Sequence, residues 1–132
     1  MEQANTGSKR PLSPHLSIHK LIPTMVMSIL HRVTGVGLYL GTALLAWWLF
    51  AAAAGSSTFD FVNGLFGSFV GQLLLLGFTW ALLQHMLGGV RHLIWDTGVW
   101  MEKSAANRLA WATLIGSLAL TVLVWVTAYG LR

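Results

Sequence analysis

Residues 61 to 96 read FVNGLFGSFVGQLLLLGFTWALLQHMLGGVRHLIWD, and this stretch decides the fold class of the chain. No charged residue interrupts it between Phe61 and Val90, and a transmembrane helix needs only about 20 predominantly apolar residues. The stretch is therefore predicted to cross a membrane. It also carries His85, and an ionisable side chain inside a membrane helix is by default a functional-site hypothesis.

Two further uncharged runs lie on either side of this one, at Val33 to Ala54 and at Leu109 to Leu131. We therefore expect an all-α integral membrane protein with three transmembrane helices, which span about residues 25–54, 61–93 and 107–131. The Gly-Ser-Ser-Thr sequence at residues 55–58 is expected to form the first turn.

The composition agrees with a membrane protein. Only 9% of the 132 residues are charged and 55% are hydrophobic, whereas about a quarter of the residues in soluble domains are charged. Cysteine is absent, so this chain itself can hold no disulfide and no cysteine-ligated iron–sulfur cluster. Any metal must be held by histidine, by carboxylate or by a partner.

The positions of lysine and arginine predict the orientation. Four of these residues precede the first span, namely Lys9, Arg10, Lys20 and Arg32. Three more lie between the second and third spans, namely Arg91, Lys103 and Arg108. By the positive-inside rule the N-terminus and the second loop are cytoplasmic and the C-terminus is periplasmic. We thus expect an N-terminal segment on the cytoplasmic face, residues 1–22, and a membrane anchor, residues 23–132. The polar segment at residues 1–10 is short for a transit peptide, which favours a bacterial chain or a mature form, so the bacterial inner membrane is expected before the mitochondrial one.

One face of the second span carries chemistry. His85, Gly88, Gly89, His92 and Asp96 follow helical spacing and share that face. Glycines beside a histidine leave room for a flat group, so this face predicts a haem with His85 as an axial iron ligand. The alternative is a histidine that is hydrogen-bonded to a neighbouring helix. Because His85 is the only deep histidine in the sequence, a site with two histidine ligands would need the second one from another subunit or from a second copy of this chain.

The residues around His85 allow two interpretations. His92 lies about 10 Å along the helix from His85, and it either binds a haem propionate or is an ordinary interfacial residue. Arg91 points to a different face and is expected to extend to the membrane surface. Gln84 is expected to hydrogen-bond within the helix bundle.

A second polar stripe lies at the start of the first span, at Ser28, Arg32, Gly35 and Tyr39, with His31 on its flank. A hydroxyl and a guanidinium near the membrane surface can donate hydrogen bonds to a quinone carbonyl. Taken alone, these residues favour a simpler interpretation, namely a helix start with an arginine that sets the topology.

Three blocks of the sequence together resemble the large cytochrome b subunits of succinate dehydrogenase, the succinate:ubiquinone oxidoreductase of respiratory membranes. The blocks are Arg10–Leu16 (RPLSPHL), Ser28–Gly35 (SILHRVTG) and His85–Asp96 (HMLGGVRHLIWD). The resemblance extends over the whole chain in length and in its three-span layout.

The resemblance implies a non-autonomous enzyme subunit in respiratory electron transport. A flavoprotein with FAD oxidises succinate, and an iron–sulfur subunit relays the electrons. This chain pairs with a second small membrane subunit in a helical bundle around haem b and forms the ubiquinone-reduction site. His85 matches the axial haem ligand, Ser28 and Arg32 match quinone-site residues, and His31, Arg32 and His92 match positions near the haem propionates.

Two alternatives stay open at this point. The chain could belong to a fumarate reductase that oxidises quinol, although its N-terminal block argues against this. It could also be a haem-free structural anchor. A channel or transporter is disfavoured because the sequence has no inverted repeat, and no nucleic-acid partner is expected.

Overall fold

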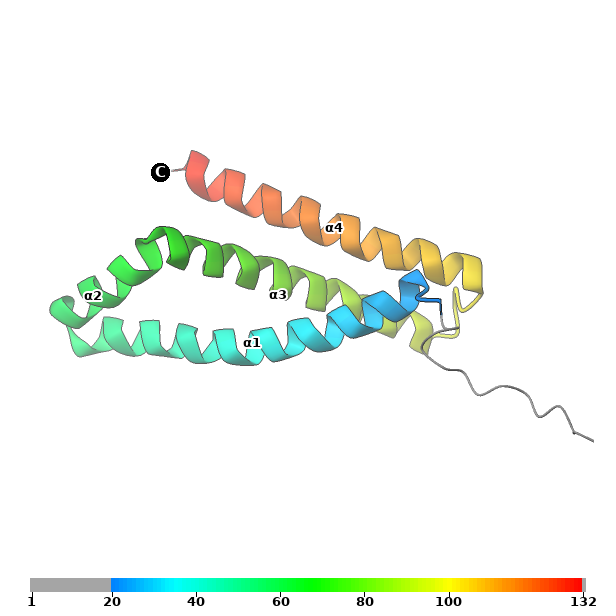
Figure 1. Ribbon diagram of the computed structural model, residues 1–132, viewed down its shortest axis with the longest axis horizontal. Coiled ribbons are helices and arrows are strands. Elements are labelled where there is room, and N and C mark those ends of the chain that lie inside the picture. Colours follow the sequence, from blue (N-terminus) through cyan, green and yellow to red (C-terminus); the bar gives the residue numbers. More distant parts are fainter. Residues whose placement is uncertain (1–19, 132) are drawn as a thin grey trace, which may run out of the picture.

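The computed structural model describes residues 20–131, which form four helices and no strand. The helices are α1 (Pro23–Ala54), α2 (Ser56–Gly67), α3 (Phe69–Asp96) and α4 (Lys103–Gly130), as shown in Figure 1. This confirms the all-α prediction. The N-terminal block at residues 10–16 lies outside the described residues.

Helices α1, α3 and α4 are each long and apolar enough to cross a membrane. They contain 32, 28 and 28 residues. At a rise of 1.5 Å per residue they are about 42–48 Å long, which exceeds the roughly 30 Å hydrocarbon core of a bilayer. The prediction of three membrane-spanning helices is confirmed, and the sidedness of the helices stays a prediction.

The second span begins later than the hydrophobic pattern predicted. The run from Phe61 is divided at Ser68 into the short helix α2 and the long helix α3. Ser68 is extended, and its hydroxyl accepts a hydrogen bond from the Gly71 backbone N–H at 3.1 Å, which caps α3. Gly71 has to be glycine because a Cβ there would collide with the Leu65 carbonyl at the end of α2. The expected turn at residues 55–58 is reduced to Gly55, where φ is 122°.

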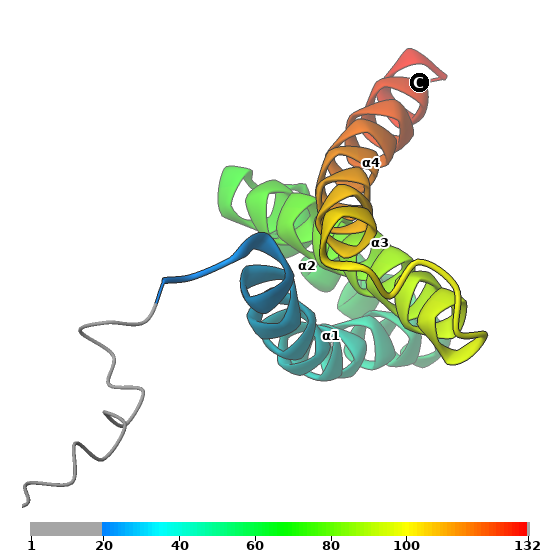
Figure 2. The same cartoon turned by 90° about the vertical axis from the view of Figure 1, so that its right-hand side faces the viewer.

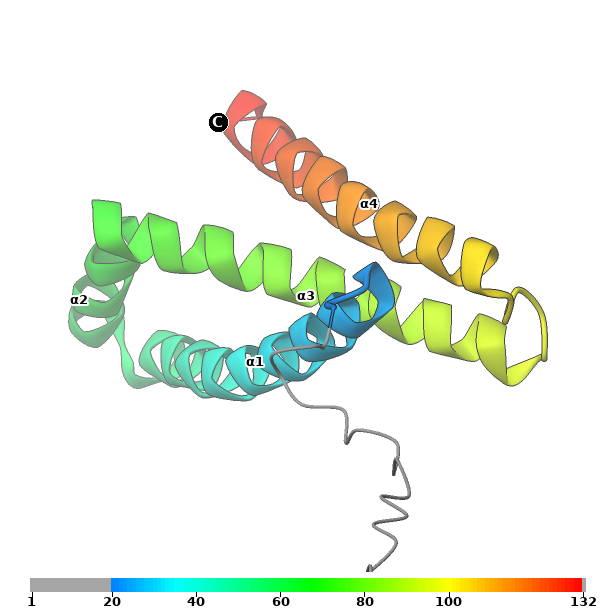
Figure 3. The ribbon, with the colours of Figure 1, turned by 45° about the vertical axis from the view of Figure 1, so that its right-hand side comes forward.

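Helix α3 lies between α1 and α4 (Figures 1 and 3). The start of α1, the end of α3 and the start of α4 gather at one end of the molecule, which we call the histidine end because it carries His31, His85 and His92. Helix α2 closes the opposite end, which we call the α2 end. Figure 2 shows α4 diverging from α1 toward its C-terminus, so the bundle is tighter at the histidine end.

The distribution of polar and apolar side chains is inverted relative to a soluble protein. Large apolar residues cover the outside of the helices, including Tyr39 at 81% and Phe50 at 69% exposure. Small and polar residues occupy the helix contacts, as is usual where lipid removes the hydrophobic drive for burial. Within residues 20–131, the buried polar or charged residues are Thr34, Gln84, Arg91, Thr113, Ser117 and Thr121.

Candidate functional site

Two histidines from different helices stack at the histidine end. The rings of His31 on α1 and His85 on α3 are nearly parallel, with 3.9 Å between centroids and 7° between planes. Each ring packs against a glycine of the opposite helix. A Cβ at Gly35 would lie 3.1 Å from His85 Cε1, and a Cβ at Gly88 would lie 2.6 Å from His31 Nδ1. The two glycines therefore allow the two rings to pass between the helices.

The two glycines that follow His85 have different surroundings. The space beside Gly88 is taken by the His31 ring, whereas a Cβ at Gly89 would meet nothing within 4 Å. The sequence suggested that both glycines leave room for a flat group. In the structure only Gly89 faces open space, because α1 brings an imidazole against Gly88.

The hydrogen bonds of His85 define which ring nitrogen can act as a ligand. Its Nδ1 lies 3.0 Å from the His31 carbonyl oxygen and 3.3 Å from Thr34 Oγ1. Because a carbonyl oxygen can only accept, Nδ1 must carry the hydrogen, and a neutral ring then has an unprotonated Nε2. Within residues 20–131 this Nε2 has no hydrogen-bond partner. The half-buried His85 therefore offers one lone pair on Nε2.

This geometry reconciles the two interpretations of His85. The residue is hydrogen-bonded to the neighbouring helix α1 through Nδ1, and it is also suited to bind a metal through Nε2. A metal-ligating histidine usually donates its second ring N–H to a carbonyl or a similar acceptor. The residues present thus fit an axial ligand of a haem iron.

His92 and Arg91 differ in burial. His92 is exposed, and its ring meets the edge of His31 at 5.3 Å between centroids. Arg91 is only 2% exposed, so the expectation that it extends to the surface is wrong. Its side chain continues the buried stripe of Ala81, Gln84 and Gly88 on α3. The guanidinium lies 5.2 Å from the Trp95 ring centroid.

Gln84, next to His85, links three helices. Its Oε1 accepts a hydrogen bond from Ser117 on α4 at 2.6 Å, and its Nε2 donates to Met27 Sδ on α1 at 3.6 Å. Gln84 is 2% exposed, so both contacts are shielded from solvent. The expectation that Gln84 hydrogen-bonds within the bundle is confirmed.

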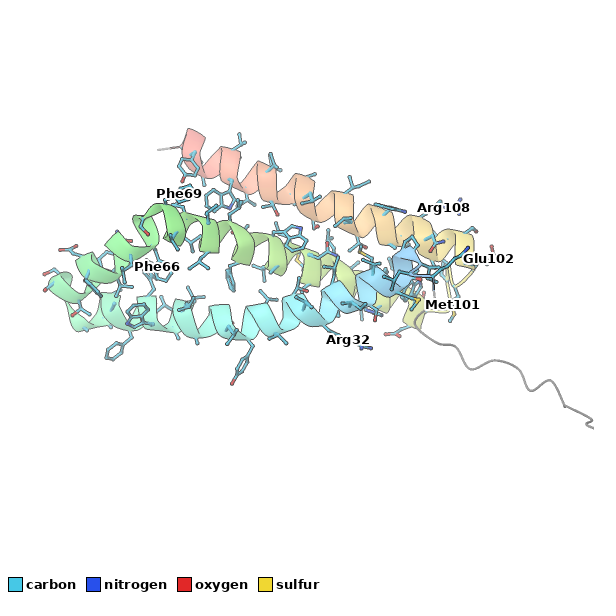
Figure 4. All side chains as sticks on the ribbon, in the orientation of Figure 1. Arg32, Phe66, Phe69, Met101, Glu102 and Arg108 are labelled. Carbon is cyan, nitrogen blue, oxygen red and sulfur yellow. The ribbon has the colours of Figure 1, made fainter. Side chains whose placement is uncertain are left out.

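The stripe of Ser28, Arg32, Gly35 and Tyr39 does not converge on one neighbour. Gly35 contacts His85, while Arg32 and Tyr39 are exposed and Ser28 is half-buried. In Figure 4 the Arg32 side chain points away from α3. The structure thus joins His31 to His85 and leaves the Arg32 guanidinium on an outer face.

Thr34 belongs to the Ser28–Gly35 block, but the sequence offered no reason to assign it a role in the candidate site. It is 3% exposed and lies beside His85. Its position, three residues after His31 on the same helix face, was the available signal. A threonine is common at such a position in membrane helices, so only the contact with His85 distinguishes it.

A cavity of about 400 Å³ lies at the other end of the bundle, between α1, α2 and α3. It is lined mainly by apolar residues, among them Gly41, Trp48, Phe66 and Phe78. Figure 4 labels Phe66 at the α2 end, far from the start of α1. The cavity has no titratable residue in its lining and so offers no acid–base or metal chemistry.

Comparison with known proteins identifies similar chains. Residues 6–124 match the family described as succinate dehydrogenase/fumarate reductase transmembrane subunit. The chain is 39% identical to the succinate dehydrogenase cytochrome b556 subunit of Rickettsia felis, over 90% of this chain and 93% of the relative. It is 37% identical to the subunit of the same name from Paracoccus denitrificans, over 98% of both chains. A mitochondrial cytochrome b560 subunit from Sus scrofa is 38% identical over 71% of this chain and 57% of the relative.

Proposed function

The chain belongs to the succinate dehydrogenase/fumarate reductase transmembrane subunit family, and from this premise we propose that it is a cytochrome b membrane anchor that holds haem b together with a second membrane subunit. Its relatives are named as subunits of an enzyme complex, so the chain acts within that complex and is not catalytic alone. FAD and the iron–sulfur clusters belong to the soluble partner subunits. The bacterial relatives and the basic N-terminus favour a bacterial inner membrane, with the site on the cytoplasmic side.

The observation that carries the haem proposal is the orientation of His85. Its Nδ1–H is held by α1, and its Nε2 lone pair is left for an iron. When bound, the haem supplies one-electron transfer. The ring of His31 is stacked on the ring of His85, with 3.9 Å between centroids, and is not free to take a position of its own. A second histidine ligand would be supplied by the partner membrane subunit.

The quinone proposal concerns the start of α1. Ser28 is half-buried and Arg32 is exposed on an outer face, where both can line a pocket completed by partner subunits. The Ser28 hydroxyl and the Arg32 guanidinium are donors suited to the quinone carbonyls, and the guanidinium also stabilises negative charge on the reduced ring. His31 and His92, which are in contact, are proposed to lie near the haem propionates.

The haem proposal is tested by the reduced-minus-oxidised optical spectrum of the membrane complex that contains this chain. His85→Leu is expected to abolish the b-type α-band, because leucine has no ligand atom. Met86→Leu is a matched control, since Met86 is the exposed neighbour of His85. A band that persists unchanged in His85→Leu would move the ligand to another residue and overturn the proposal.

The quinone proposal is tested by comparing two activities of the same complex. Ser28→Ala and Arg32→Leu are expected to lower succinate-driven ubiquinone reduction, by about tenfold or more for Arg32, because a hydrogen bond to a charged group is lost. Succinate oxidation by a soluble artificial acceptor should stay at the wild-type rate. Wild-type ubiquinone reduction in both variants would remove these residues from the site.

A further inference from the structure

The Thr34 hydroxyl is hydrogen-bonded within α1 and also lies against His85. The Thr34 hydroxyl lies 2.7 Å from the Leu30 carbonyl oxygen and 3.0 Å from the His31 carbonyl oxygen. The hydroxyl hydrogen is therefore used within α1, in the i−4 pattern common for threonine in helices. The remaining lone pairs of Thr34 Oγ1 are free to accept, and the nearest donor is His85 Nδ1 at 3.3 Å.

The His85 N–H is consequently shared between two acceptors of the same helix. One is the His31 carbonyl oxygen at 3.0 Å, and the other is Thr34 Oγ1 at 3.3 Å. The His31 carbonyl also faces the N–H of residue 35 in the helical pattern, so its lone pairs are already partly used. Thr34 supplies the additional acceptor that keeps the N–H satisfied in a buried place, where an unsatisfied donor is costly.

We propose that Thr34 is a positioning residue for the haem ligand His85. It fixes the ring plane and the tautomer of His85 from the neighbouring helix α1, and it increases the electron density on Nε2. The inference rests on the proposed role of His85 as an axial ligand. Gly35, one residue further along α1, is the matching steric element, because its missing side chain lets the His85 ring approach.

The chemical consequence concerns the iron that His85 binds. A hydrogen-bond acceptor on the ring N–H that does not bind the metal raises the basicity of a ligating histidine. A more basic ligand favours the oxidised metal. Removing one acceptor should therefore shift the haem midpoint potential upward. Haem binding itself should survive, since the His31 backbone carbonyl still holds the ring.

The test uses three variants of the intact membrane complex. Thr34→Val keeps the shape and removes the hydroxyl, whereas Thr34→Ser keeps the hydroxyl. Thr42→Val is the control, because Thr42 makes the same i−4 bond, to Leu38 at 2.8 Å, on an exposed part of α1. The readouts are the haem content, the midpoint potential from a redox titration and the shape of the α-band.

We expect Thr34→Val to raise the midpoint potential and to change the α-band, with Thr34→Ser and Thr42→Val close to wild type. A wild-type potential in Thr34→Val overturns the proposal. An equal shift in the valine and serine variants also overturns it, because the effect would then come from packing.

The spectra of His85→Leu and Thr34→Val together distinguish an error in the Thr34 proposal from an error in the assignment of His85 as the haem ligand. If the b-type band survives in His85→Leu, the haem ligand is elsewhere and both proposals fall. If the band is lost in His85→Leu while Thr34→Val matches wild type, His85 remains the ligand and only the positioning role of Thr34 falls.

Discussion

The histidine end and the α2 end of the bundle are both closed by helix contacts, yet they use different side chains for it. At the histidine end two imidazoles fill the space between α1 and α3, 3.9 Å apart. At the α2 end a mostly apolar cavity of about 400 Å³ remains. Ionisable groups are expensive inside a membrane, so the presence of His31, His85 and the buried Arg91 at one end marks where the chemistry is expected.

Two glycines, Gly88 at the histidine end and Gly41 at the α2 end, show the same contrast between the two ends of the bundle. A Cβ at Gly88 would meet the His31 ring at 2.6 Å, and a Cβ at Gly41 would collide with the Phe78 ring. Both glycines let an aromatic ring pass between α1 and α3. At the histidine end the ring belongs to the candidate site, and at the α2 end it belongs to the wall of the cavity. Identical substitutions at the two ends should therefore have different consequences.

The largest effect is expected for Gly88→Ala. The added methyl group must displace the His31 ring, and overpacking of this kind typically costs about 1–3 kcal/mol. Because His31 stacks on His85, the b-type α-band of the complex should shift or weaken. The measurements are the thermal inactivation midpoint of the membrane complex and its reduced-minus-oxidised spectrum.

Two glycine variants sharpen this prediction. Gly77→Ala adds the same methyl group to the same helix where nothing lies within 4 Å, so both measurements should match wild type. Gly41→Ala should lower the stability of the complex and leave the haem band unchanged. If Gly88→Ala and Gly77→Ala gave the same spectrum, the contact between Gly88 and His31 would be irrelevant to the site.

A smaller effect is expected from the glutamines that tie the helices at each end. Gln84 is buried and links α3 to Ser117 and Met27, while the half-buried Gln72 bonds to Tyr129 Oη at 2.6 Å and to the Phe66 carbonyl at 2.8 Å. A hydrogen bond between membrane helices contributes about 0.6 kcal/mol on average, and up to roughly 1.7 kcal/mol.

Gln84→Leu should therefore lower the thermal midpoint of the complex more than Gln72→Leu, since the Gln84 contacts are fully buried. Leucine preserves most of the volume in both cases, so the comparison isolates the polar contacts. A greater loss of stability in Gln72→Leu would show that the α2 end, and not the region beside His85, holds the bundle together.

The sequence predicted the long elements better than their boundaries. Hydrophobic length alone identifies α1, α3 and α4 as spans, because a lipid-exposed backbone must satisfy its hydrogen bonds within one helix. The division at Ser68 escaped this pattern, since the residues on both sides of it are uncharged and apolar. A serine followed three residues later by Gly71 was the only local sign of a new helix start.

The candidate site was predicted in part. His85 is conspicuous because it is ionisable within an apolar run, and that signal is local. The burial of Arg91 was not predicted, because helical spacing gives the direction of a side chain and not the helix that covers it. The role of Thr34 was hidden for the same reason, since its significance comes from a residue 51 positions away in the chain.

The sequence by itself determined that the chain is helical, that it has three stretches able to span a membrane, and that His85 is its most exceptional residue. These properties depend on hydrophobic length and on the cost of placing a polar group in lipid, and both are encoded locally. Only the tertiary structure decided that His31 stacks on His85, that Gly88 makes room for His31, and that α1 fixes the tautomer of His85. These features depend on the packing of α1 against α3, which joins groups separated by 54 positions in the chain.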